Sequence, residues 1–257
     1  MQIEIIMSLK VVSTIFAISI IYFTIIFSSS ASLYLDSNFL FSVEPQQPFT
    51  ISDHEFHAYL EQMIGHLDAS ILNVQNNNSV LAVAHALHPI EEIVDVINSR
   101  LIQTNETLTK EFSSKLNKYV QTVRSDNLNK IVIEKRELEK LLSNALEQSI
   151  SLEKRTNRDH ILNVTADLIT IASEEYAESM SQGKIINLLE YQDGQQFFKR
   201  AINLLDKSQA YLSENDNKNY LTRLNKLTKG IDSKIDPSEI DMNVKDMLCE
   251  IKKGFYC

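Results

Sequence analysis

The chain has 257 residues, with 25 Lys and Arg against 34 Asp and Glu and a formal net charge of −9 at pH 7. It contains only 5 Gly and 4 Pro, whereas average usage gives roughly 30 in a chain of this length. Because strands joined by tight turns need these residues at most corners, sandwiches, barrels and glycine-loop enzymes are disfavoured. The acidic balance disfavours nucleic acid as a partner, since phosphate binding needs clustered Lys and Arg.

The first apolar segment predicts export. Residues 11–27 are uncharged and apolar, with Lys10 before them and small residues up to Ser32 after them. This pattern is typical of a signal peptide, and its length also reaches the lower limit for a membrane-spanning helix. We therefore predict residues 1–32 as a signal peptide or membrane anchor. In both cases the rest of the chain is extracytoplasmic, either secreted or anchored by residues 11–27.

The remaining chain divides into a linker and one domain. Residues 33–49 contain two of the four prolines and show no helical period, which predicts a linker. Residues 50–257 are predicted to form the helical bundle domain. Because an exported chain permits disulfides, we predict one between the two cysteines, Cys249 and Cys257.

Helical periodicity runs through the predicted domain, and we expect no sheet. A capping box at Ser52–Glu55 begins the first helix. The expected helices cover approximately residues 53–74, 79–101, 106–124, 125–154, 162–180, 185–212, 220–227 and 238–253. Gly183 is expected to stop the fifth helix, and Gly230 with Pro237 to separate the last two. The fold class is therefore all-α: a multi-helix bundle with a four-helix-bundle-like core and extra C-terminal helices.

Five of the 6 histidines lie within residues 54–88, on the first two predicted helices. His85 and His88 are followed by Glu92 at i, i+3 and i+7, so the three share a helix face, and His54 and His57 have the same relation to Glu61. Side chains three or four apart on a helix have Cβ atoms about 5–6 Å apart, close enough to share one ion. Antiparallel pairing of the two helices brings His66 towards His85 and His88.

The histidine cluster predicts a metal site with nitrogen and oxygen ligands, because no cysteine accompanies it. Such a ligand set suits a divalent transition metal such as Fe, Cu or Zn. Pro89 is expected to interrupt the second helix beside the histidines. We expect His85 and His88 to lie off the apolar stripe. The candidate ligands from spacing are His66, His85, His88 and Glu92 at one site, with His54 and His57 as a looser outer pair.

Two acidic clusters lie on later predicted helices, and each can be interpreted as part of a site or as a solvated face. Glu190 and Asp193 are three residues apart and lie beside Gly194, which permits close approach of another helix or a ligand. Either these carboxylates contribute to a site in the bundle, or they form a solvated face, which we favour. Glu175 and its acidic neighbours Glu174 and Glu178 are also expected to be solvated.

Catalytic motifs are absent from the sequence. It contains no GxSxG, no GxxxxGK[ST], no GxGxxG and no HExxH. We therefore predict that the protein is not an enzyme.

Two motifs carry a resemblance to known proteins. The run His85-Ala-Leu-His-Pro-Ile-Glu91, followed by Glu190-Tyr-Gln-Asp193, resembles exported helical-bundle proteins of archaea, and the resemblance spans about residues 54–212. Some of those relatives occur beside or fused to iron-permease-type membrane proteins. The HxxE of His88 and Glu91 is also similar to that of imelysin-like periplasmic proteins linked to iron uptake. The resemblance implies extracytoplasmic metal handling, with His88 and Glu91 as ligands.

Taken together, the sequence predicts an exported helical bundle that binds a divalent transition metal, as an uptake accessory, a metallochaperone or a sensor input domain. The implied partners are the metal ion and a membrane permease or membrane complex. The alternative is a scaffold or accessory subunit of a membrane complex that binds no metal.

Overall fold

The structure is a computed structural model that describes residues 51–252. The predicted signal or anchor, the linker up to residue 49 and Cys257 lie outside the described residues. Export and the disulfide therefore remain predictions. Within residues 51–252 no helix is both long enough and apolar enough to cross a membrane.

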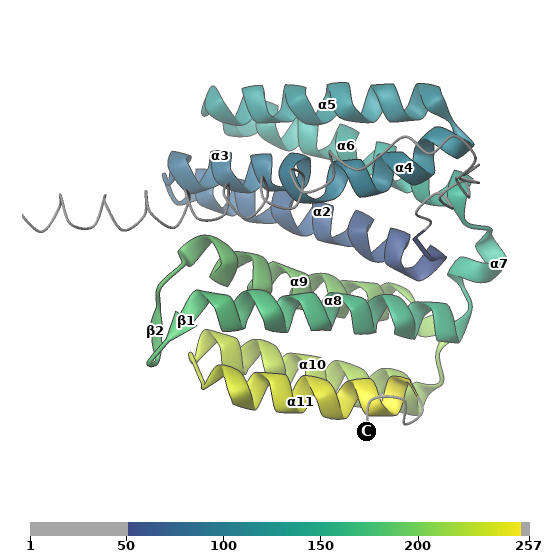
Figure 1. Cartoon of the computed structure of the whole chain (residues 1–257), viewed down its shortest axis with the longest axis vertical. Helices are drawn as coiled ribbons and strands as arrows, with labels where there is room; N and C mark the ends of the chain where they lie inside the picture. Colours follow the sequence, from purple (N-terminus) through teal and green to yellow (C-terminus); the bar gives the residue numbers. More distant parts are fainter. Residues whose placement is uncertain (1–50, 253–257) are drawn as a thin grey trace, which may run out of the picture. The chain divides into compact units, whose positions relative to one another are not determined.

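The described residues are predominantly helical, which confirms the predicted all-α multi-helix bundle (Figure 1). The long helices are α2 (Asp53–Gln75), α3 (Ser79–His88), α4 (Val94–Thr104), α5 (Glu106–Arg124), α6 (Leu128–Ser149), α8 (Arg158–Ser179), α9 (Leu188–Lys207), α10 (Glu214–Asp232) and α11 (Pro237–Ile251). The short elements are the π-helical turn η1 (Pro89–Ile93), α7 (Leu152–Arg155), the strands β1 (Met180–Ser181) and β2 (Lys184–Ile185), and the 3-10 turn η2 (Gln209–Tyr211).

Polar caps, rather than glycine and proline, begin most of these helices. The Ser52 hydroxyl accepts a hydrogen bond from the Glu55 amide while the Glu55 carboxylate accepts one from the Ser52 amide, which confirms the predicted capping box. Asparagine side chains cap five further helices by accepting amide hydrogen bonds. These residues are Asn78, Asn105, Asn127, Asn157 and Asn187.

The expectation of no sheet is wrong at one point. β1 and β2 pair antiparallel, with Met180 opposite Ile185 and Ser181 opposite Lys184. The two residues between the strands both have positive φ, 49° at Gln182 and 71° at Gly183, as a two-residue type I′ hairpin requires. Gly183 therefore forms this turn and does not stop the helix, because α8 ends at Ser179.

Three other helix boundaries differ from the prediction. The expected helix over residues 125–154 is broken into α6 and α7, and that over 185–212 is reduced to α9 and η2. The helix expected over 220–227 is longer, because α10 continues through Gly230. A Cβ at Gly230 would lie 2.7 Å from Ile235 Cδ1, so glycine here allows close packing and does not end the helix.

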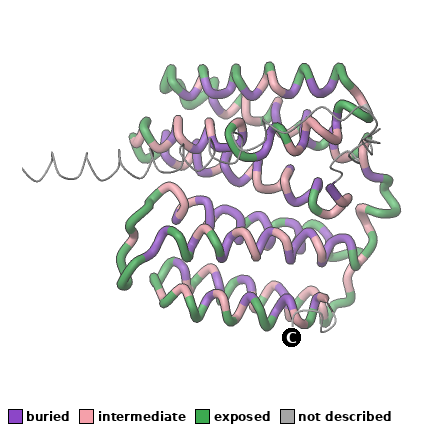
Figure 2. The backbone as a smooth tube through the Cα atoms, in the orientation of Figure 1, coloured by how far each residue is buried: buried purple, intermediate pink, exposed green. Residues whose placement is uncertain are grey.

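The buried apolar residues form two cores, and the chain passes from one to the other near residue 151. One core is formed by α2 to α6 with η1, and the other by α8 to α11 together with Ala58 of α2. Figure 2 shows buried residues on the facing sides of the helices. The predicted four-helix packing is present, and the C-terminal helices form a four-helix group of their own. Helix α2 contacts both α8 and α9, so it joins the two groups.

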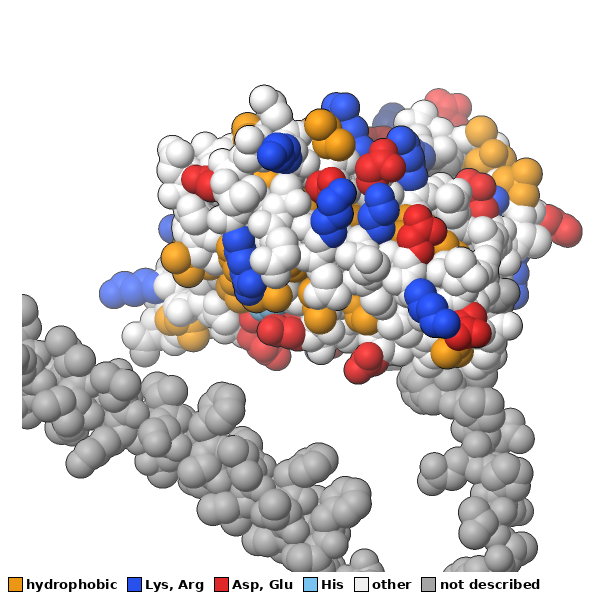
Figure 3. Space-filling model, turned by 90° about the horizontal axis from the view of Figure 1, so that it is seen from above, with side chains coloured by type: hydrophobic (Ala, Val, Ile, Leu, Met, Phe, Trp, Pro, Cys, Tyr) orange, Lys and Arg blue, Asp and Glu red, His pale blue; other side chains and the backbone are white. Residues whose placement is uncertain are grey.

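The face formed by α5 and α6 carries charged side chains of both signs (Figure 3). Lys118 lies 2.6 Å from Glu134, and Lys140 lies 2.9 Å from Glu137. Such exposed pairs are worth no more than about 1 kcal/mol each.

Candidate metal centre

Asp193 lies in α9 and is completely buried, at 0% exposure. Its Oδ1 accepts hydrogen bonds from His66 Nδ1 at 2.8 Å and from His85 Nδ1 at 3.0 Å. His88 Nδ1 lies 3.2 Å from the other carboxylate oxygen, Oδ2. Three imidazoles from α2 and α3 therefore converge on one buried carboxylate.

Two glycines bring the helices of this centre close together. A Cβ at Gly65 on α2 would lie 2.8 Å from a ring carbon of Phe197 on α9. A Cβ at Gly194 on α9 would lie 2.9 Å from the Ala172 carbonyl oxygen of α8. At both positions a larger side chain would prevent this close approach of the helices. Each glycine is also next in sequence to a residue of the centre. The close approach predicted for Gly194 is thereby confirmed.

Gln192 fixes the orientation of the deepest histidine. His85, at 0% exposure, places Nε2 at 2.7 Å from Gln192 Oε1, which also accepts a hydrogen bond from Asn73 Nδ2 at 2.7 Å. In the tautomer that could ligate a metal, the proton is on Nε2 and is donated to this amide oxygen, while Nδ1 faces Asp193 as an unprotonated nitrogen instead of a hydrogen-bond donor. Metal-ligating histidines characteristically donate their second N–H to such an acceptor, which sets the ring orientation.

Two buried polar atoms in the centre have no hydrogen-bond partner. They are Asp193 Oδ2 and His88 Nδ1, which lie near each other without forming a hydrogen bond. Leaving a buried polar atom unpaired costs about 1–3 kcal/mol, and more for a charged group. A cation between a carboxylate oxygen and an imidazole nitrogen would satisfy both atoms, so the residues present fit a metal ion.

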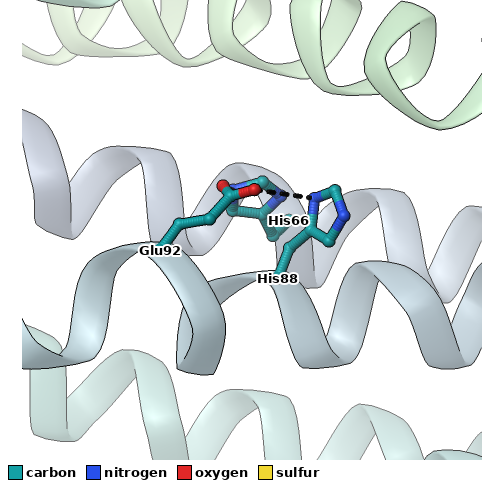
Figure 4. Close-up of side chains that lie close together, drawn as sticks. All are labelled: His66, His88 and Glu92. Carbon is teal, nitrogen blue, oxygen red and sulfur yellow. Dashed lines mark ion pairs between the residues drawn. The ribbon is translucent and has the colours of Figure 1, made fainter. Parts of the chain in front are cut away.

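Three more carboxyl groups surround this core. Glu92 Oε2 lies 3.9 Å from His66 Nε2, and its Oε1 lies 3.8 Å from His88 Nδ1. Figure 4 shows the side chains of Glu92, His66 and His88 pointing towards one another from neighbouring helical segments. Glu190, in the first turn of α9, is hydrogen-bonded to Glu175 of α8.

The crowding of carboxyl groups displaces their pKa values. Burial, then the hydrogen bond and charge of Glu190, raise the pKa of Glu175 to about 9. Burial also raises the pKa of Glu92, against the opposing effect of His88 and His66. Burial alone would raise the pKa of Asp193, but the charge of His66 and the histidine hydrogen bonds hold it well below its usual value.

The pKa of His88 moves in the opposite direction from that expected for a buried imidazole. Burial lowers it, but the close contact with Asp193 and its charge, followed by the charges of Glu92 and Glu190, raise it overall. The centre is therefore strongly attractive to positive charge.

Three overlapping groups of side chains have ligand atoms close enough to hold one ion. Within each group these atoms lie within 4.8 Å of one another. The groups are His66, His88 and Glu92; His66, His85 and Asp193; and His88, Glu190 and Asp193.

The structure does not bring every predicted ligand to this centre. His54 Nδ1 lies 2.6 Å from Asp167, and His57 Nδ1 lies 3.1 Å from His160 Nε2. Both contacts lie towards the N-terminal end of α2. Glu91 is exposed and belongs to none of the three groups.

Three expectations about burial are wrong. His85 and His88 were placed off the apolar stripe, yet both are buried because α9 covers this face of α3. Asp193 and Glu175 were assigned to solvated faces, yet Asp193 is completely buried and Glu175 is half-buried. The sequence signals for Asp193 are Gly194 beside it, its spacing from Glu190 and the Glu190–Asp193 motif of the resemblance. The interruption expected at Pro89 is observed as η1, in which the Val94 amide donates to the Pro89 carbonyl.

Comparison with known proteins links the C-terminal part of the chain to iron permeases. Residues 151–256 match the family model of the iron permease-associated 4-helix bundle domain. No curated protein and no solved structure matches the chain. The matched segment contains α8 to α11, including Asp193, Glu190 and Glu175, whereas the histidines of the centre precede it. The match supports a link between this segment and iron-uptake-related helical bundles.

Proposed function

We propose that the protein binds a divalent transition metal ion, physiologically iron, at the centre around Asp193. The observation that carries this proposal is the convergence of three histidines on a buried carboxylate that retains an oxygen without a hydrogen-bond partner. Imidazole nitrogen with carboxylate oxygen suits Fe(II), Zn(II) and Cu(II). The role we propose is binding, not catalysis.

The family match supports a place for this binding beside a membrane permease. The matched segment is described as iron permease-associated, and it supplies Asp193 and Glu190 to the centre. In this proposal the domain lies outside the membrane, exported by the N-terminal apolar segment, and holds iron for a permease-type partner. Iron is then a cargo and not a resident cofactor.

Direct titration of protein carrying no histidine tag tests the proposal. Fe(II) is added without oxygen, Zn(II) and Cu(II) are added separately, and each titration is followed by calorimetry. We expect binding much tighter than millimolar for at least Fe(II). Asp193→Asn should weaken it by roughly tenfold or more, because the buried charge is lost while the shape is kept.

Two further variants separate ligation from a general effect on folding. His88→Gln removes a ligand at the less buried side of the centre and should also weaken binding. Asp167→Asn removes a carboxylate that likewise accepts a histidine hydrogen bond, at 2.6 Å from His54, and should leave affinity unchanged. The proposal would be contradicted if Asp193→Asn and His88→Gln bound as tightly as wild type, or if no ion bound more tightly than millimolar. Either result would favour the metal-free scaffold.

A further inference from the structure

The carboxyl groups of the centre are more numerous than one ion requires. Glu92, Glu175, Glu190 and Asp193 lie in one cluster with His66, His85 and His88. The ion pairs within residues 51–252 give Glu92 and Asp193 histidine partners only, with no Lys or Arg.

The three ligand groups can be combined into two simultaneous sites in one chemically sound way. Two of the three pairings share a histidine, and an imidazole joins two metal ions only after losing both ring protons. The third pairing shares Asp193, whose two oxygens can each serve a different ion. One group, with His66 and His85, uses the Oδ1 side, and the other, with His88 and Glu190, uses the Oδ2 side.

We propose that the centre holds two divalent cations bridged by Asp193. The inner ion is bound by His66, His85 and Asp193 Oδ1, and the outer ion by His88, Glu190 and Asp193 Oδ2. This inference rests on the proposed function and extends it from one ion to a pair.

The outer position has its own structural support. Asp193 Oδ2 and His88 Nδ1 are the two buried atoms of this centre that have no hydrogen-bond partner, and both residues belong to the outer group. Oδ1, in contrast, accepts two hydrogen bonds from the inner histidines, and the inner ion would replace these bonds once the two Nδ1 atoms have lost their protons. Glu92, 3.8 Å from His88, and Glu175, hydrogen-bonded to Glu190, lie beside the outer position.

The inner and outer positions differ in access and in ligand type. His85 and His66 are 0% and 2% exposed, whereas the Glu92 side chain is 50% exposed. The inner ion therefore has mainly nitrogen ligands in a buried place, and the outer ion has mainly oxygen ligands near solvent. Oxygen ligands favour harder cations, so Mn(II) is a suitable probe of the outer position.

Mn(II) stoichiometry and electron paramagnetic resonance test the pair in the intact protein. Carboxylate-linked ions in two-metal sites are typically about 3.5–4 Å apart, which couples their unpaired electrons magnetically. We expect two Mn(II) ions per chain and the broadened, multiline spectrum of a coupled pair. One ion per chain with the spectrum of isolated Mn(II) would overturn the pair but leave single-ion binding intact. No binding of Mn(II), Fe(II) or Zn(II) would overturn the proposed function as well.

Variants of the outer position identify its ligands. Glu190→Gln should reduce the stoichiometry from two ions to one and abolish the coupled spectrum, and His88→Gln should do the same through a different helix. Glu174→Gln is the matched control, because it removes an exposed carboxylate next to Glu175 on α8. Two coupled ions in both outer variants, or loss of an ion in the control alone, would overturn the assignment.

Discussion

The buried pair of His57 and His160 is expected to make the protein sensitive to acid. Burial, together with the charges of Arg155 and Arg200, lowers the pKa of His57 to about 4. Burial and the charge of His57, then of His54, lower that of His160 to about 4 as well. An unfolded histidine has a pKa of about 6.5. As the pH falls, the unfolded state therefore binds protons before the folded state does. The stability that is present above about pH 6.5 is lost as the pH falls towards 4.

Urea unfolding at pH 7 and pH 5 measures this effect. Each neutral imidazole should account for about 1–2 kcal/mol of lost stability between these two pH values. His160→Gln keeps a polar partner for His57 and removes one titrating ring, so its loss on acidification should be smaller by that amount. His54→Gln, in which the ring removed is part of a partly exposed ion pair, is the control. An equal loss in wild type and His160→Gln would contradict the prediction.

At the scale of elements, the contact between α8 and α9 depends on Gly194. Its Cβ position lies 2.9 Å from a carbonyl oxygen and 3.2 Å from the Tyr176 amide nitrogen, and backbone atoms cannot move aside as a side chain can. Gly194→Ala should destabilise the protein by about 1–3 kcal/mol. It should also weaken metal binding, because the adjacent Asp193 moves with α9. Lys199→Ala, at an exposed position of the same helix, should change neither quantity beyond about 0.5 kcal/mol.

Chemical denaturation measures the stability of both variants, and calorimetry measures their affinity for Fe(II). A fully stable Gly194→Ala protein would show that the helices can separate at this point without cost. Reduced stability with unchanged affinity would show that the position of Asp193 does not depend on the close approach.

The sequence predicted features that depend on nearby residues better than features that depend on tertiary packing. The capping box at Ser52 and the interruption at Pro89 are determined by residues a few positions away, so both were predictable. The type I′ hairpin was missed because Gln182 contributes a positive φ that its residue type does not announce. The continuation of α10 through Gly230 was missed because packing against Ile235 overrides the propensity of glycine.

The composition of the centre could be predicted only in part. His66, His85 and His88 share one helical hairpin, so their spacing revealed them. Asp193 lies 127 positions from His66, in a polar stretch that resembles an exposed face, and only the tertiary fold buries it. Long-range contacts of this kind leave no periodic signal in a single sequence.

At the scale of the whole molecule, a bound ion should stabilise both helix groups together. Its ligands come from α2 and α3 on one side and from α9 on the other, so it binds only the assembled fold. At a free concentration one hundred times the dissociation constant, a ligand of this kind adds about 2.7 kcal/mol. For a protein of this size that corresponds to a rise in melting temperature of roughly 5–10 °C.

Thermal unfolding with and without Fe(II) or Zn(II) checks this expectation. A single transition should move upward as a whole. Asp193→Asn should show no comparable shift at the same ion concentration. Stabilisation of only one of two separate transitions would show that the ion does not join the groups.

The separation of His66 and Asp193 along the chain also has a consequence for the unfolded ensemble. An ion that remained attached to both residues would close a loop of 127 positions. The entropy removed by closing a loop grows with the logarithm of its length, which is why long-range cross-links restrict a chain most. Because the ion binds only the assembled fold, unfolding releases it and restores the full entropy of this long loop, whereas a disulfide would keep such a loop closed in the unfolded chain.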